Sequence, residues 1–228
     1  MEEGWPLLES IIHLLINQQI INMKLAPMLF MAITFLGLSS CQEEETPTLV
    51  PVQSVTFENL YAPQEGGQGQ PVSGPFTKFN FETGNTTTSE TEWDIAFRGT
   101  TIIVNGGQSL GNADEPERTG NAGAYLATGT LSDITAVDVA LISGDGPEDT
   151  AIPSGSGNSW YTYNPTTHLI TPTPGKILVF QTHDGRFAKM EILSYYQDAP
   201  AQPDPFMTPS KYYTFNYVYQ PNEGITTF

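Results

Sequence analysis

Four side chains in the C-terminal part of the chain could donate a neutral ligand to a transition metal such as iron. They are His168, His183, Met190 and Met207. Imidazole and thioether groups are donors of this kind. Two of them must approach one metal from opposite sides, so their donor atoms must lie within about 4–5 Å of each other. The possible chemistry is therefore capture of a metal-centred ligand, provided that the fold brings two donors together.

Residues 176–196 contain two of the four donors and predict a β-hairpin. We expect Asp184-Gly185 to form a two-residue type I′ turn, which places His183 opposite Arg186. Met190 then lies on the apolar face of the hairpin, and the other face is mixed and partly in contact with water. At strand rise Met190 is about 13 Å beyond Arg186, so His183 and Met190 cannot bind one metal. We expect Met190 in the core and His183 exposed beside the turn.

The other two donors lie in predicted turns and loops. His168 follows the turn signal Asn-Pro-Thr-Thr of residues 164–167, where it could either cap the turn or act as a ligand. Met207 follows Phe206 in the Pro-rich loop 199–210, which could fold over an apolar face. These two loops are the elements that must position a site.

The sequence carries no motif of a known class of catalytic site. It lacks GxSxG, HExxH, a P-loop and CxxC, and its acidic residues are not paired at a recognisable spacing. We therefore expect a protein that is not an enzyme.

Composition favours an all-β domain. Charged residues make up only 14% of the chain, whereas 21 Gly and 18 Pro supply many turns. The net charge of −17 argues against nucleic acid and against charge-driven binding to an anionic membrane surface. It also disfavours anionic ligands.

The N-terminal segment resembles a bacterial lipoprotein signal peptide over residues 23–40. Lys24 precedes an apolar run that is too short to span a bilayer comfortably, and small residues follow. Leu38-Ser39-Ser40-Cys41 resembles a lipobox, in which the cysteine becomes the lipid-modified first mature residue. The alternative is an ordinary signal peptide with an incidental Cys41, the single cysteine of the chain.

These features divide the chain into four parts. Residues 1–22 are either an upstream extension from a start codon placed too early or a longer amphipathic leader. Residues 23–40 are the signal peptide, 41–52 an acidic and Pro-containing tether, and 53–228 one all-β domain. The acidic run that follows Cys41 is either a surface-export signal or a solvated linker. Residues 1–40 hold three Glu and one Lys, so the net charge of the remainder is −15.

Alternation predicts most strands of the domain, ending with an aromatic stripe of Tyr213, Phe215, Tyr217 and Tyr219 that should face the core. In the segment 93–98, Trp93 is expected on the same face as Ile95 and Phe97. Residues 65–74 are predicted to be a loop and 84–90 a turn, and 132–140 could be a short helix or a strand. The predicted strands are 54–60, 76–81, 93–98, 102–104, 124–130, 160–163 and 212–219, besides the two of the hairpin.

Four sequence blocks in order, with the lipobox, carry a resemblance to a known family. They are WDIAFR with VNGG, AGAY, WYTYNPTTH, and VFQTHDGRFAKMEILSYYQD followed by the aromatic last strand. Together they resemble the HmuY-like family of Bacteroidetes lipoproteins over nearly all of the mature chain. The resemblance implies a single antiparallel β domain anchored to the outer membrane and exposed at the cell surface. It also implies binding of haem, for iron acquisition, and its transfer to an outer-membrane receptor of the TonB-dependent type.

The resemblance further implies two axial side chains on the haem iron. The segment that would carry the first, 142–158, contains neither His nor Met, and the position of the second is Pro165. Only His168 is carried over, three residues beyond it, as the expected metal ligand. Met207 and His183 are the other expected contacts of haem or a related tetrapyrrole. The alternative is a non-haem binding or structural lipoprotein on the same scaffold, with a glycan, peptide or receptor partner.

Overall fold

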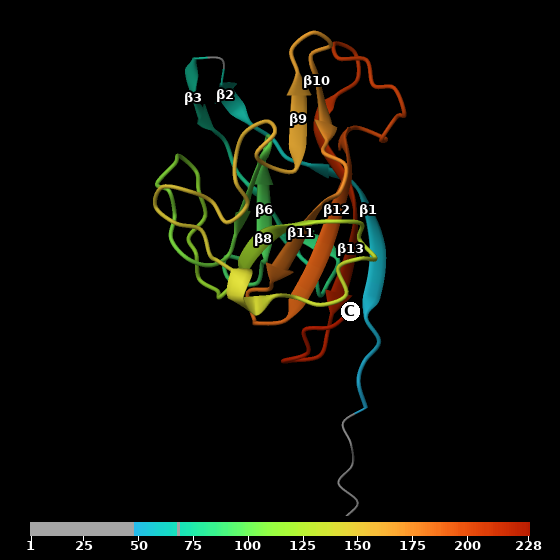
Figure 1. The fold of residues 1–228 in the computed structure, drawn as a ribbon. Coiled ribbons are helices and arrows are strands. Elements are labelled where there is room, and N and C mark those ends of the chain that lie inside the picture. Colours follow the sequence, from blue (N-terminus) through green and yellow to red (C-terminus); the bar gives the residue numbers. More distant parts are fainter. Residues whose placement is uncertain (1–47, 68) are drawn as a thin grey trace, which may run out of the picture. The chain divides into compact units, whose positions relative to one another are not determined.

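The computed structural model describes residues 48–67 and 69–228. The predicted signal peptide, the lipobox and Cys41 lie outside this part of the chain. The described residues form antiparallel β-sheets with one short 3-10 turn, Val139–Leu141, so the prediction of an all-β domain is confirmed (Figure 1). The strands are β1 (Gln53–Tyr61), β2 (Glu65–Gly67), β3 (Gln70–Ser73), β4 (Thr77–Asn80), β5 (Asn85–Thr87), β6 (Ile95–Arg98), β7 (Thr101–Val104), β8 (Gly123–Thr128), β9 (Tyr161–Asn164), β10 (Leu169–Pro172), β11 (Lys176–Gln181), β12 (Phe187–Tyr196) and β13 (Ser210–Gln220).

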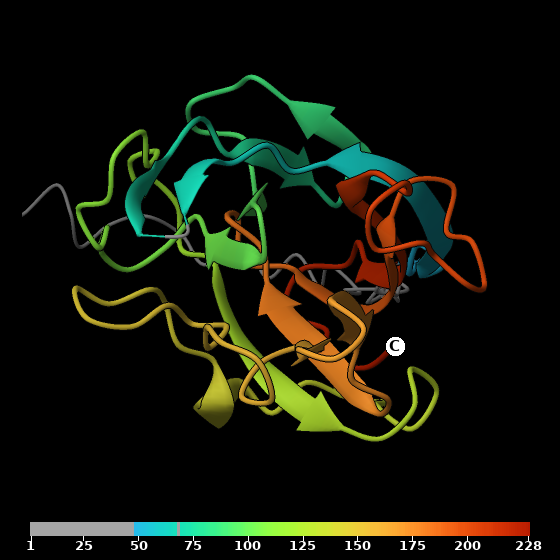
Figure 2. The same cartoon turned by 90° about the horizontal axis from the view of Figure 1, so that it is seen from above.

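Two larger sheets enclose the main core. One has the order β1-β13-β12-β11-β8 and the other β5-β4-β6-β7, while β2–β3 and β9–β10 form separate hairpins. Seen from above, the green β4–β7 half lies across from the half that contains β8, β11 and β12 (Figure 2). The predicted aromatic stripe of β13 is buried in this core: the Phe215 ring meets Phe79 of the opposite sheet edge-on at 5.4 Å. Interlocked aromatic rings of this kind fix the spacing of the two sheets.

The register of the β11–β12 hairpin differs by one residue from the prediction. Met190 pairs with Leu178 rather than with Val179. The loop has three residues, 183–185, and is closed by the Thr182 amide, which donates to the Arg186 carbonyl at 2.8 Å. A type I′ turn needs a positive φ at both central residues, but only Gly185 has one, at 90°.

The hairpin is also buried on both faces, so the expected partly wetted face is wrong. Leu178, Ala188 and Met190 belong to the main core, and the prediction of a core position for Met190 is confirmed. Val179 and Phe187 point the other way and pack in a second cluster. Segment 131–142 and the C-terminus cover this outer face, and the hairpin sequence alone gives no sign of such a cover.

Three local predictions need correction. The segment 65–74 is not simply a loop, because it holds the short β2–β3 hairpin, and 84–90 contains β5, in which Thr87 pairs with Lys78. Trp93 does not share the face of Ile95, because β6 begins only at Ile95. Trp93 packs instead on the opposite face of the four-stranded sheet.

The domain has two distinct ends along the five-stranded sheet. At one end β1 begins, with Gln53 paired to Tyr219. At the other end Tyr196 of β12 pairs with Ser210, and its hydroxyl accepts a hydrogen bond from the Ile170 amide of β10 at 3.0 Å. The β9–β10 hairpin therefore projects from the end opposite to the start of β1 (Figure 1).

Candidate functional site

His168 occupies the last position of the turn that joins β9 to β10. The Asn164 side chain organises this turn, because its Oδ1 accepts the amides of Thr166 at 2.9 Å and Thr167 at 3.3 Å. His168 then closes the turn with a φ of 57°. This left-handed conformation costs a residue with a Cβ roughly 1–2 kcal/mol, and Gly or Asn normally occupies it. A strained position of this kind often carries a functional side chain.

The His168 ring has one nitrogen engaged and one available. Its Nδ1 lies 3.0 Å from the hydroxyl of Tyr163, and its ring centroid lies 5.8 Å from that of Phe206. A hydrogen bond to one ring nitrogen fixes the orientation of an imidazole whose other nitrogen binds a metal. In the tautomer in which Nδ1–H donates to the Tyr163 hydroxyl, Nε2 carries the lone pair that a metal can bind.

The loop between β12 and β13 brings the Phe206 ring beside His168 and carries Met207 as the next residue. The Asp204 carboxylate accepts the amides of Phe206 at 2.8 Å and Met207 at 2.9 Å, and the Asp204 amide donates to Thr208 Oγ1 at 2.9 Å. These bonds order the tip of the loop, while both apolar side chains stay 80% exposed. Two such residues on an ordered turn form an apolar surface that a ligand could cover. We call His168, Tyr163, Phe206 and Met207 the His168 tip.

The structure brings Phe206 and its neighbour Met207 to the hairpin of His168, but it does not bring His183 there. His183 precedes β12, whereas the His168 hairpin contacts the far end of that strand through Tyr196. Ten residues of β12 separate the two ends, about 30 Å at strand rise. The iron of one haem cannot contact both histidines. The prediction that His183 and His168 belong to one site is therefore wrong.

His183 has a different role, as a link between the two sheets. Its amide and its Nδ1 both lie within hydrogen-bonding distance of Asp94 Oδ1, at 2.9 and 2.6 Å. The other oxygen of this buried carboxylate accepts the Phe81 amide at 2.7 Å. The His183 side chain is only 20% exposed, so the expectation of an exposed His183 is also wrong. The pair ties the β11–β12 turn to the four-stranded sheet.

The His183 link should make stability depend on pH. The hydrogen bond to Asp94 is the largest cause that raises the pKa of His183 above 6.5. Because the pKa of His183 is higher in the folded than in the unfolded chain, protonated His183 stabilises the fold. This stabilisation is fully present below about pH 6.5 and is lost as the pH rises through the pKa of the folded state. We expect the free energy of unfolding, measured by urea titration at a series of pH values, to fall over that interval. His183→Asn should remove this fall and His168→Ala should keep it; an unchanged fall in His183→Asn would contradict the link.

The sequence analysis does not identify Tyr163 of the His168 tip or Asp204, which orders the loop of Phe206 and Met207. The sequence predicts Tyr163 only as part of a strand, although a Tyr and a His that flank a four-residue segment can meet. Asp204 was not singled out, but an Asp two residues before an exposed aromatic is a signal for a side-chain-capped turn. Both could have been found from local turn chemistry.

Among the residues that the structure describes, no group of three or more His, Cys, Asp or Glu side chains is arranged to hold a metal ion. The same described residues contain no helix long and apolar enough to cross a membrane.

Three solved structures resemble this chain. An apo HmuY analog from Tannerella forsythia is 15% identical, with a TM-score of 0.48, and the match covers 76% of this chain and 99% of that chain. A candidate lipoprotein from Bacteroides fragilis is 14% identical, with a TM-score of 0.44 and coverage of 76% and 94%. A candidate HmuY-like haem-binding protein from Bacteroides vulgatus is 14% identical, with a TM-score of 0.42 and coverage of 75% and 93%. Two of the three carry the HmuY name that the sequence blocks suggested.

No protein-family model matches the sequence, and the comparison with curated proteins found no match.

Proposed function

We propose that this chain is a non-enzymatic, surface-anchored lipoprotein that binds haem or a related tetrapyrrole at the His168 tip. Cys41 would carry the lipid anchor in the outer membrane, and a TonB-dependent outer-membrane receptor would take the haem for iron acquisition. The observation that carries the proposal is an imidazole, held by Tyr163, beside the Phe206 ring on a loop whose Phe206 and Met207 side chains are both 80% exposed.

The residues at the tip fit a tetrapyrrole in chemical type. Bound haem would supply an iron that takes neutral imidazole and thioether donors. His168 Nε2 would be one donor and Met207 Sδ the other, and the Phe206 ring would lie against the apolar macrocycle. Its carboxylate groups would stay in water, because the net negative charge of the chain opposes the burial of further anionic groups.

Absorption spectroscopy tests the proposal directly. We expect a haemin titration of the purified chain to give a saturable, sharp low-spin Soret band. His168→Ala should weaken binding on the order of 100-fold, or about 2.7 kcal/mol, and change the spectrum. Met207→Ala should change the spectrum as well.

Two further variants serve as controls. His168→Gly removes the donor while suiting the positive φ, so a loss of binding in this variant cannot come from backbone strain at residue 168. His183→Asn removes a histidine at the other end of β12 and should leave the spectrum unchanged. A broad Soret band identical to that of free haemin would contradict the proposal. It would also be contradicted if His168→Gly gave the same haem spectrum as the unaltered chain. The chain would then be a binding or structural lipoprotein without haem.

A further inference from the structure

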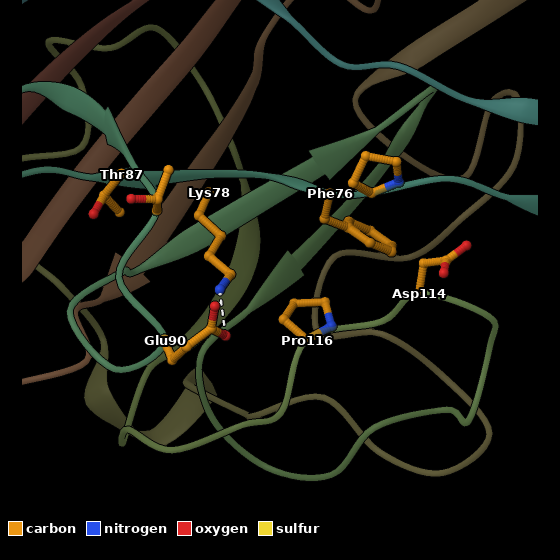
Figure 3. Close-up of a pocket in the computed structure, with 8 residues that line it drawn as sticks. Phe76, Lys78, Thr87, Glu90, Asp114 and Pro116 are labelled. Carbon is orange, nitrogen blue, oxygen red and sulfur yellow. Dashed lines mark hydrogen bonds and ion pairs between the residues drawn. The ribbon is translucent and has the colours of Figure 1, made fainter.

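A hollow of about 350 Å³ lies beside Phe76 of the outer-face cluster of the four-stranded sheet (Figure 3). None of its lining residues belongs to the His168 tip. Its apolar wall is made by Pro75 and Phe76, which precede β4, and by Pro116 of the loop between β7 and β8. Figure 3 shows the rings of Phe76 and Pro116 on neighbouring sides of the hollow. The volume lies in the range of small-molecule sites.

Polar groups of both charge signs surround this wall. Lys78 Nζ donates to Glu90 Oε2 at 2.7 Å and to the Ser89 carbonyl at 3.1 Å. Glu90 is 82% exposed, so most of its carboxylate stays accessible. Thr87 and Asp114 complete the polar side. Asp114 uses Oδ2 to accept the Gly74 amide at 2.8 Å, and within the described residues its Oδ1 makes no hydrogen bond.

Buried Arg98 holds the two sides of the hollow in place. Its Nη1 donates to the Ala113 carbonyl at 2.5 Å and to the Gly74 carbonyl at 3.2 Å, which joins the Asp114 loop to the segment before β4. Its guanidinium group also lies 4.2 Å from the centre of the Phe76 ring. Arg98 is only 4% exposed. The hollow is therefore preformed rather than a gap between mobile loops.

We infer that this hollow binds a neutral sugar unit of a glycan. The C–H face of a pyranose ring suits the apolar wall of Phe76 and Pro116, and its hydroxyl groups suit the accessible oxygens of Glu90 and Asp114. Hydrogen bonds to charged groups are the strong ones. The negative charge of the chain disfavours an anionic ligand. A neutral, hydroxyl-rich ligand avoids this repulsion, and its hydroxyl groups can donate to Glu90 without displacing Lys78 from its ion pair.

Tryptophan fluorescence and NMR can detect such binding. Trp93 lies in the Phe76 cluster, and its Nε1 donates to the Glu90 carbonyl at 3.2 Å, so a ligand at Glu90 should alter its emission. The purified full chain is titrated with methyl glucopyranoside and N-acetylglucosamine, and with glucuronate as the matched anionic probe. We expect a saturable change with at least one neutral sugar, accompanied by shifts of the Thr87 and Thr88 amides, and a weaker response to glucuronate.

Variants then locate the site. Glu90→Gln and Asp114→Asn should each weaken the response about tenfold, because each replaces a charge-assisted hydrogen bond by a neutral one. Glu58→Gln, which changes an exposed Glu of β1, should leave it unchanged, as should His168→Gly. The inference is overturned if no neutral sugar gives a saturable change, if glucuronate binds more tightly, or if Glu90→Gln and Asp114→Asn respond like the unaltered chain. None of these outcomes depends on haem binding.

Discussion

Replacing Asp145 by alanine is expected to lower the free energy of unfolding by about 3–5 kcal/mol, the range found when one partner of a buried ion pair is removed. The Asp145 carboxylate is fully buried and lies 2.9 Å from Nη2 of Arg118, which is itself 2% exposed. It also accepts the amides of Val104 at 3.0 Å and Ala151 at 2.8 Å. Alanine would leave these buried donors without an acceptor, and urea or guanidinium unfolding would measure the loss.

The expected loss of stability arises because the buried Arg118 guanidinium and the two amides would lose their acceptor. It does not mean that the ion pair itself contributes a large net stabilisation. Burial is the largest influence on the pKa of Asp145 and raises it, even with Arg118 beside it. Asp145→Asn should cost less than Asp145→Ala, because an amide oxygen can still accept one of the hydrogen bonds. Exposed Asp149→Ala should change stability by less than about 0.5 kcal/mol. If Asp145→Ala lowered the free energy of unfolding by less than about 1 kcal/mol, the contacts of Asp145 with Arg118, Val104 and Ala151 would not be important for stability.

Gly106→Ala should lower the free energy of unfolding by about 3 kcal/mol, at the upper end of the range for added bulk in a packed site. A Cβ at Gly106 would lie 1.9 Å from the Ala122 carbonyl oxygen. That oxygen belongs to backbone that is itself held in place, since the Ala122 amide donates to the Asn105 carbonyl at 3.0 Å. The clash cannot be relieved by a side-chain rotation, so β7 and the start of β8 would have to separate.

Gly146→Ala is the matched control for this prediction. Its φ is not in the left-handed region, and the nearest atom to an added Cβ is the Asp149 carbonyl oxygen at 3.5 Å. Alanine there should be neutral or slightly stabilising, because it restricts the unfolded chain. Equal unfolding midpoints for Gly106→Ala and Gly146→Ala would rule out the close approach at Ala122.

Strand positions could be predicted from the sequence because side-chain alternation is a local property. The same reasoning failed for the register of β11 and β12. An Asp-Gly pair suits both a two-residue turn and a three-residue loop with glycine last. The structure has the longer loop, in which the His183 amide donates to Asp94 of the other sheet rather than to the hairpin. Asp94 is 89 residues away in sequence, so no local pattern could have revealed this contact.

The same limit applies to the His168 tip. His168 could be singled out as a donor after a turn signal, and Met207 as a donor in a Pro-rich loop. The structure joins their two loops, which are separated in sequence by β10, β11 and β12, through the contact between the His168 and Phe206 rings. Sequence reasoning placed His183 in the same set because residue type was its only criterion. The three-dimensional path of β12 separates the two histidines.

The positions of the two ends of β1 have a consequence for any ligand. β1 begins at Gln53 beside Tyr219, and the His168 tip lies beyond the other end of the sheet, past the level of Tyr61 and Tyr212. Nine residues of strand span about 30 Å. If Cys41 carries a lipid anchor, the tether would join the domain at the start of β1, and the length of β1 would separate this junction from a ligand at the His168 tip.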